Sequence, residues 1–147
     1  MMPAKKLITL TKSDMLLQIQ TWLSAWDKHD LDGVMELMHD EVVFENWTGI
    51  SIAGKQALRR AWAPWFMQHG NFKFIFEDIF VDEEAQKSLF QWRLEWPSLE
   101  KAHKGKSEIR GGVDVLHFLD GKIYKKYSYS KTTLIIDGSP IALFAAP

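Results

Sequence analysis

Residues 107–131, SEIRGGVDVLHFLDGKIYKKYSYSK, have the pattern of two long antiparallel strands joined by a tight turn. Asp120-Gly121 is a strong signal for a two-residue hairpin turn. The period of two puts Asp114 on one face of the first strand, together with the following residues: Arg110, Gly112, Leu116 and Phe118. Val113, Val115 and His117 then point to the other face. The stretch therefore predicts a long hairpin with one carboxylate on an otherwise apolar inner face.

The chain before this hairpin continues the same pattern. From Ser88 to Trp96 the residues alternate cleanly, and one face carries Phe90, Trp92, Leu94 and Trp96. An earlier strand begins after Asn71, and its alternation slips near Glu77-Asp78, which indicates a β-bulge. These segments predict a meander of long antiparallel strands.

The first half of the chain has a helical period instead. Ser13 is the expected N-cap of a helix whose apolar stripe is Met15, Ile19, Trp22, Leu23 and Trp26. Asp30 is expected to cap a short second helix that carries Leu31, Val34, Met35 and Met38. A strand over residues 42–47 follows, and then a third helix from about Lys55 to Gln68, which Pro64 should kink or end. Helices followed by a strand meander predict an α+β fold.

Composition limits the class of protein. The 147 residues suit one domain, 1–147, with a core of about 13–131 and a tail, 132–147, that docks on it. There is no cysteine, so disulfides and thiolate metal sites are excluded. Eighteen basic against 19 acidic residues argue against nucleic-acid binding. We expect no membrane span, because no apolar run is long enough, and we expect a cytoplasmic protein because the start is not a signal peptide.

The order of motifs resembles a known superfamily. The motifs are Asp30-Leu31-Asp32-Gly33 after the first helix, Gly54-Lys55-Gln56-Ala57-Leu58 at the third, and Asp120-Gly121-Lys122-Ile123 in the hairpin. Over residues 13–131 the chain resembles the SnoaL-like and ketosteroid-isomerase-like branch of the nuclear transport factor 2-like superfamily. The resemblance implies a cone-shaped, cystatin-like roll, in which three N-terminal helices pack on a strongly curved, mostly antiparallel sheet around a deep apolar pocket. It also implies a homodimer formed through the outer face of the sheet.

The resemblance also places the chemistry of ketosteroid isomerases on this chain. The tyrosine position falls on Trp22, the carboxylate base on Asn46, and the protonated aspartate on Asp114. The key aspartate of polyketide cyclases and limonene-epoxide-hydrolase-like members falls on Ser128. An amide cannot abstract a proton from carbon, so the usual bases are absent.

Asp114 remains the candidate catalytic residue, as an acid or oxyanion donor, with Asn46 orienting the substrate. Asp114 is alternatively a structural partner of Lys126 or Arg110 in a buried ion pair. Without a partner, burial would raise the pKa of Asp114 and make it a hydrogen-bond donor to a ligand oxygen. With Lys126 close by, it would stay ionised and serve as a base or bind a cation. Asn46 either contacts a ligand or caps the turn at Thr48-Gly49.

The rest of the candidate site is apolar. The expected ligand-binding residues, besides Asp114 and Asn46, are Trp22, Phe44, Trp62, Phe90, Trp92, Trp96, Leu116, Phe118, Lys126 and Ser128. On the last strand the resemblance places Tyr124, Lys126, Ser128 and Ser130 inside, whereas one bulge would exchange them for Ile123, Lys125, Tyr127 and Tyr129.

The expected ligand is a small apolar or aromatic molecule, with no cofactor and no metal. Two alternatives to an isomerase, cyclase or lyase stay open: a binding module without catalysis, and an interaction domain whose pocket is filled by Trp92 and Trp96.

Overall fold

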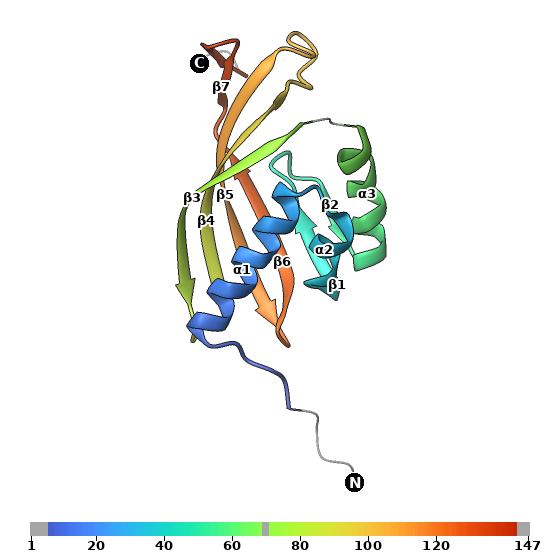
Figure 1. Cartoon of the computed structure of the whole chain (residues 1–147), viewed down its shortest axis with the longest axis vertical. Coiled ribbons are helices and arrows are strands. Elements are labelled where there is room, and N and C mark those ends of the chain that lie inside the picture. The colour runs from blue at the N-terminus through green and yellow to red at the C-terminus, as the bar shows by residue number, and fades with distance from the viewer. Residues whose placement is uncertain (1–5, 69–70, 144–147) are drawn as a thin grey trace.

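The computed structural model describes residues 6–68 and 71–143 and has an α+β fold (Figure 1). Three helices in the first half of the chain, the last of them after β1 and β2, lie against one face of a strongly curved sheet. The helices are α1 (Lys12–Asp27), α2 (Leu31–Glu36) and α3 (Lys55–Gln68). The predicted roll of helices on a curved sheet is confirmed.

The sheet combines antiparallel pairs with one parallel pair. Its main path runs in the order β2-β1-β6-β5-β4-β3, and β7 pairs with β5 and β8. The strands are β1 (Met38–Glu45), β2 (Ser51–Ala53), β3 (Lys73–Asp82), β4 (Lys87–Pro97), β5 (Ser107–Leu119), β6 (Lys122–Ser130), β7 (Thr133–Ile136) and β8 (Ser139–Ala142). The parallel pair joins β1 to β6, which puts the first strand of the chain next to the long hairpin.

Two predictions at the N-terminal end of the chain are wrong. Thr11, not Ser13, caps α1, and its hydroxyl oxygen accepts a hydrogen bond from the backbone N–H of Asp14. Met38 is the first residue of β1 and not part of the second helix, which ends at Glu36. Its side chain is almost fully buried, so it is apolar because it belongs to the core. Its distance from Met35 matches a helical spacing only by coincidence.

Pro64 does not end the third helix, which continues to Gln68. Proline removes one backbone donor from a helix and leaves one carbonyl without its partner. Pro64 lies on the exposed face of α3, where such a carbonyl can bind water. The bulge predicted near Glu77-Asp78 is confirmed, because the pairing of β3 with β4 shifts between Phe76 and Asp78.

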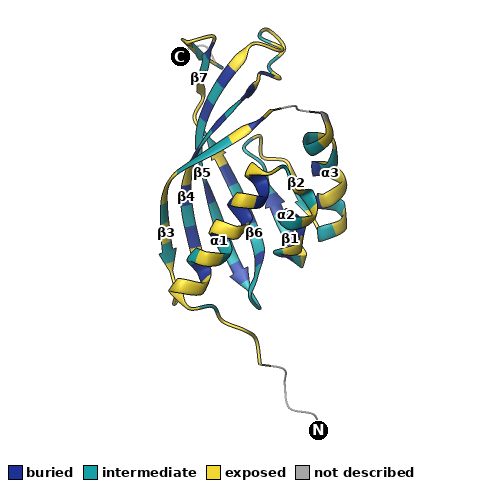
Figure 2. Ribbon diagram, viewed as in Figure 1, coloured by how far each residue is buried: buried dark blue, intermediate teal, exposed yellow. Residues whose placement is uncertain are grey.

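Buried residues alternate with less buried ones along the long strands (Figure 2), so the sheet has an inner and an outer face. On β4 every predicted inner residue is buried, and on β5 Arg110, Asp114, Leu116 and Phe118 are buried. On β6 both predicted phases occur, because a bulge opposite His117 and Phe118 changes the register. Ile123 is buried before the bulge, and Lys126 and Ser128 are buried after it. Tyr124, expected inside, is only half-buried and packs on the ring of His39.

The C-terminal tail forms the hairpin of β7 and β8. Ile135 and Ile136 of β7 pair with the start of β5, and Leu134 is fully buried. Phe144, which we expected to dock with this tail, lies outside the described residues, as do 145–147. None of the helices in 6–68 and 71–143 has the length and apolarity needed to cross a membrane.

Candidate functional site

A pocket of about 160 Å³ lies between the helices and the inner face of the sheet. Its wall is mainly aromatic, and four polar residues lie among the aromatic ones. The lining residues are Trp22 and Trp26 of α1; Ala61, Trp62 and Trp65 of α3; Phe44, Asn46, Trp47 and Ile52 of the β1–β2 region; and Phe74, Phe76, Phe90, Trp92, Asp114, Lys126 and Ser128 of β3 to β6. Such a lining suits a flat apolar molecule that carries a polar group.

The tryptophans of the helices belong to the core and to the pocket wall at once. Trp22 and Trp62 are almost fully buried, and both line the cavity. Trp26 joins them, with its ring centroid 5.8 Å from that of Trp22 and 5.0 Å from that of Trp62, in edge-to-face geometry. These contacts make a closely packed aromatic wall.

Asp114 and Lys126 form an ion pair at the polar end of the pocket. One carboxylate oxygen, Oδ2, lies 2.9 Å from Nζ of Lys126, and the other, Oδ1, accepts a hydrogen bond of 3.0 Å from the indole N–H of Trp92. The ammonium group also donates to Ser128 Oγ at 2.7 Å. All three polar side chains are less than a tenth exposed. Of the alternatives for Asp114, the structure therefore contains the pair with Lys126, whereas Arg110 lies elsewhere.

Aromatic rings hold the lysine from the other side. Nζ of Lys126 lies 4.7 Å from the centroid of Phe44 and 5.9 Å from that of Trp62. The face of an aromatic ring attracts a cation, more strongly when water is excluded. The carboxylate of Asp114 and the two rings thus surround the amino group of Lys126 inside an apolar cavity.

Asn46 lies at the edge of the pocket and also at the start of the turn after β1. It can therefore contact a ligand and cap the turn from the same position. Its side-chain oxygen accepts a hydrogen bond of 2.8 Å from the backbone N–H of Trp47, and its backbone carbonyl accepts from Gly49. The side chain lines the cavity from the end of β1. Its amide group is thereby fixed at the edge of the pocket.

Three expected lining residues lie outside the pocket. Leu116 and Phe118 are buried further along β5, where Gln86 connects the end of the strand to the start of α1. Trp96 is buried beside the pocket wall, 4.7 Å from the ring of Trp65, and its indole N–H donates to Glu108. The cavity therefore occupies only the middle of the inner face.

Trp47 is a lining residue that sequence reasoning missed. We expected it at the end of a strand over residues 42–47, but β1 ends at Glu45 and Trp47 follows it in a turn, where alternation does not define the direction of a side chain. Its ring lies 5.8 Å from that of Trp92, and the guanidinium of Arg110 lies 4.9 Å above it. Arg110 thereby helps to hold one wall of the pocket.

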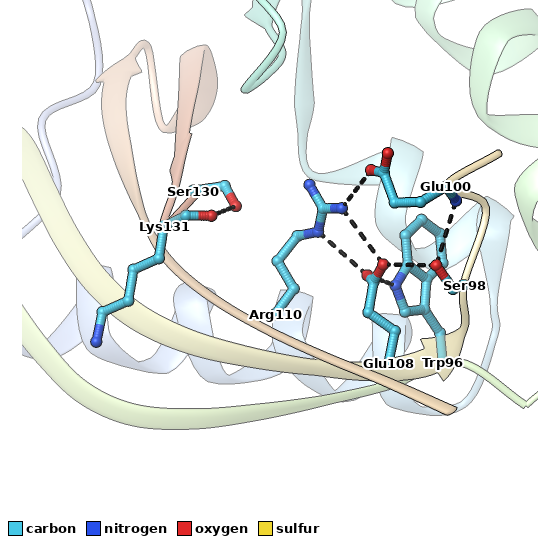
Figure 3. A network of polar contacts seen from close by, with 7 residues as sticks. All are labelled: Trp96, Ser98, Glu100, Glu108, Arg110, Ser130 and Lys131. Carbon is cyan, nitrogen blue, oxygen red and sulfur yellow. Dashed lines mark hydrogen bonds and ion pairs between the residues drawn. The ribbon is translucent and has the colours of Figure 1, made fainter. Parts of the chain in front are cut away.

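Arg110 belongs to a buried polar network next to the pocket (Figure 3). Glu108 is fully buried and accepts hydrogen bonds from Trp96, Ser98 and Arg110. Arg110 also donates to Glu100 at 2.8 Å. Figure 3 shows that these residues converge from β4, β5 and the loop between them, while Ser130 and Lys131 of the neighbouring strand end lie apart.

Comparisons with known proteins agree with this architecture. The family model of the SnoaL-like domain matches residues 19–126. No curated protein matches the sequence.

Solved structures with the same fold include proteins of different activities. An NTF2-like protein of unknown function from Mesorhizobium loti is 24% identical, with a TM-score of 0.66, over 84% of this chain and 99% of its own. A protein described as a SnoaL-like polyketide cyclase from Jannaschia sp. CCS1 is 13% identical, with a TM-score of 0.70, over 86% and 92%. An LEH-like epoxide hydrolase from M. tuberculosis is 17% identical, with a TM-score of 0.66, over 81% and 84%.

Proposed function

The chain belongs to the family of SnoaL-like domains, and on that premise we propose that it binds a small apolar or aromatic molecule in the pocket and acts on it as an isomerase, cyclase or lyase. The observation that carries the proposal is the ion pair of Asp114 and Lys126 within an aromatic cavity. A buried ion pair is often no more stable than apolar residues of similar volume. Its place at the ligand cavity therefore favours a chemical role over a purely structural one.

The proposed chemistry is proton transfer next to a carbonyl group. The carboxylate of Asp114 takes a proton from the carbon beside the carbonyl, and the electron pair of that C–H bond moves to the carbonyl oxygen. Donors at the polar end of the pocket stabilise the negative charge on that oxygen. Returning the proton to another carbon isomerises the molecule, whereas attack of the enolate carbon on a second carbonyl closes a ring. Asp114 serves as the base in this scheme, because each carboxylate oxygen has two lone pairs and only one of these contacts, from Trp92 on one oxygen and Lys126 on the other.

Two measurements test this function. A thermal-shift screen with enones, phenols, terpenoid epoxides, polyketide-like aromatics and short fatty acids finds the ligand class, because a ligand at 100 times its Kd stabilises by about 2.7 kcal/mol. Proton NMR in deuterium oxide then detects solvent deuterium at the carbon beside the carbonyl. We expect Asp114→Asn to abolish deuterium incorporation while the protein still folds. Asp137→Asn, in the turn between β7 and β8, is the matched control.

The results separate the candidate functions. Binding without deuterium incorporation, or incorporation that survives in Asp114→Asn, would contradict the base role of Asp114. A ligand that binds and is never converted would show that the protein is a binding module without catalysis. Asn46 and Ser128 favour this function, because neither an amide nor a hydroxyl is a base. If no compound in the screen shifts the melting temperature, the proposal of a ligand pocket is contradicted and an interaction domain remains.

We also propose that the chain forms a homodimer through the outer face of the sheet. The support is an apolar row across four strands, in which Phe80, Leu89, Val115 and Tyr127 are successive pairing partners. Phe80 is 59% exposed, and an apolar ring so exposed gains from a partner surface. The partner is a second copy of the chain.

A further inference from the structure

The polar end of the pocket has more hydrogen-bond donors than the described residues use. A lysine ammonium has three protons and accepts nothing. Lys126 is ion-paired with Asp114 and donates one proton to Ser128, and among residues 6–68 and 71–143 no other acceptor lies within hydrogen-bond distance of its Nζ. The third N–H is therefore free for a ligand.

Ser128 and Asn46 are in the same situation. Because an ammonium only donates, Ser128 accepts from Lys126, and the proton of its own hydroxyl stays available. Asn46 uses its side-chain oxygen to accept from the N–H of Trp47, which leaves the NH₂ group as its free end. Both residues line the cavity.

The three donors come from two neighbouring parts of the sheet and line one cavity. Phe44 of β1 pairs with Lys126 of β6, and Glu45 pairs with Tyr127. Asn46 directly follows Glu45 at the end of β1, and Ser128 directly follows Tyr127 on β6. The one carboxylate at this end, Asp114, accepts from Trp92 on one oxygen and has its charge balanced by Lys126 at the other. The polar end of the pocket is therefore rich in donors and poor in acceptors.

From this arrangement we propose that Lys126, Ser128 and Asn46 form an anchor for a negatively charged oxygen, so that the ligand is a small aromatic carboxylate or phenolate and not a neutral or cationic molecule. The inference rests on the proposed function and names its ligand class. Hydrogen bonds from a charged donor, or to a charged acceptor, are about twice as strong as neutral ones, and exclusion of water strengthens them. The aromatic wall packs on the ring of the ligand, and a cavity of about 160 Å³ is near the size that holds one benzene ring.

Three probes of nearly one shape test the anchor. Benzoate is an anion, benzamide its neutral counterpart and benzylamine a cation, and each Kd is measured by isothermal titration calorimetry near neutral pH. We expect benzoate to bind about 10- to 100-fold more tightly than benzamide, the range for a hydrogen bond to a charged group. Benzylamine should not bind measurably, because it has no acceptor for the three donors.

Two substitutions identify the residues. Ser128→Ala removes one donor and leaves the ion pair in place, so the affinity for benzoate should fall about tenfold with little change for benzamide. Ser130→Ala is its control on the same strand, because Ser130 lies outside the pocket lining and donates to the carbonyl of Lys131. Asn46→Asp keeps the oxygen that accepts from Trp47 but exchanges the NH₂ group for a second acceptor. It should abolish benzoate binding and allow benzylamine to bind.

Each outcome bears on a separate statement. Equal affinities for benzoate and benzamide, both lowered by pocket substitutions, would overturn the anionic anchor and leave the proposed ligand pocket standing. Binding of benzoate that is unchanged in both Ser128→Ala and Asn46→Asp would also overturn the anchor, since the anion would then bind elsewhere. If none of the three probes binds and the wider screen gives no shift, the proposed function fails together with the anchor.

Discussion

The ion pair of Asp114 and Lys126 gives the pocket a polar end without a net charge. Either residue alone would bring an uncompensated charge into an aromatic cavity, at a cost of several kcal/mol. Together they keep a carboxylate and an ammonium within reach of one ligand. The indole N–H of Trp92 fixes the carboxylate from a third side. The position of Trp92 therefore decides the orientation of Asp114.

Gly112 makes room for that tryptophan. A Cβ at residue 112 would lie 2.4 Å from a ring carbon of Trp92 and 2.2 Å from the carbonyl oxygen of Tyr129. We therefore expect Gly112→Ala to lower the free energy of unfolding by about 3 kcal/mol, at the upper end of the cost of overpacking. It should also weaken ligand binding, because Trp92 must move away from Asp114. Urea denaturation measures the first effect and calorimetry with benzoate the second.

The neighbouring glycine is the control. A Cβ at Gly111 would meet nothing closer than 3.8 Å, and its backbone conformation is an ordinary one. Gly111→Ala should leave the protein as stable as before, or up to about 1 kcal/mol more stable, because alanine restricts the unfolded chain. Similar losses for both variants would show that the strand, and not the space for Trp92, sets the requirement for glycine.

The sequence alone indicated that Asp114 faces inward but not which cation it contacts. Alternation along β5 placed Arg110 on the same face, and the phase of β6 depended on a bulge that has no signal of its own in the residues. The bulge opposite His117 and Phe118 brings Lys126 inward while Ile123 stays buried. A difference of one residue in register therefore decided the composition of the site.

Strand β5 carries two separate polar groups on one inner face. Asp114 serves the pocket, whereas Glu108 and Arg110 at the start of the strand connect β4, the loop after it and Trp47. Alternation predicted that Arg110 faces inward, but not its partners. Glu100 and Ser98 come from a loop, and their approach to β5 depends on the path of that loop and not on any period in the sequence.

We expect the network to behave as a coupled unit. Arg110→Met leaves the carboxylate of Glu108 buried without a cation and should cost about 3–5 kcal/mol of unfolding free energy. The double variant Glu108→Gln with Arg110→Met should cost clearly less than Arg110→Met alone, because no buried charge is then left. Urea denaturation of both singles and the double gives the coupling free energy.

Arg93 on β4 provides the comparison. It pairs with Glu77 and Glu95 at 3.5 and 3.4 Å, but about two fifths of its side chain is exposed. Arg93→Met should therefore cost no more than about 1 kcal/mol. A loss for Arg110→Met as small as that for Arg93→Met, or strictly additive effects of Glu108→Gln and Arg110→Met, would refute the coupling.

The molecule as a whole depends on one pairing that local patterns do not reveal. β1 runs parallel to β6, with Met38 opposite Ile123 and Phe44 opposite Lys126. This pairing brings Asn46 and Phe44 to the polar end of the pocket. Sequence patterns predicted the strands of the meander and the helices with few errors, since those signals are local. They could not predict a contact between residues about 80 positions apart, which depends on how the entire chain packs.

The outer face of the sheet is the remaining large surface, and a second copy of the chain should cover it. Val115 lies in the middle of the apolar row, between Leu89 and Tyr127. Val115→Lys places a charge at the centre of the proposed interface, so we expect a monomer where the unchanged protein is a dimer. Sedimentation equilibrium measures the mass. Thr133→Lys, at an exposed position of β7, should leave the dimer intact. A monomeric unchanged protein, or a dimer that tolerates Val115→Lys, would exclude this interface.

The next row of the outer face should make the proposed dimer sensitive to pH. Lys87, His117 and Lys125 are successive pairing partners there. The pKa of His117 lies below its ordinary value of 6.5, first because burial removes water from the ring and then because Lys87 and Lys125 repel its charged form. The folded chain thus binds this proton less readily than the unfolded chain, so stability is highest above the ordinary value and falls as the pH drops from that value to the lowered pKa. A second copy adds to the burial and lowers the pKa further, so dimerisation should weaken as the pH drops below the lowered pKa of the single chain. His117→Gln should remove that part of the pH dependence, and an unchanged profile would assign it to other groups.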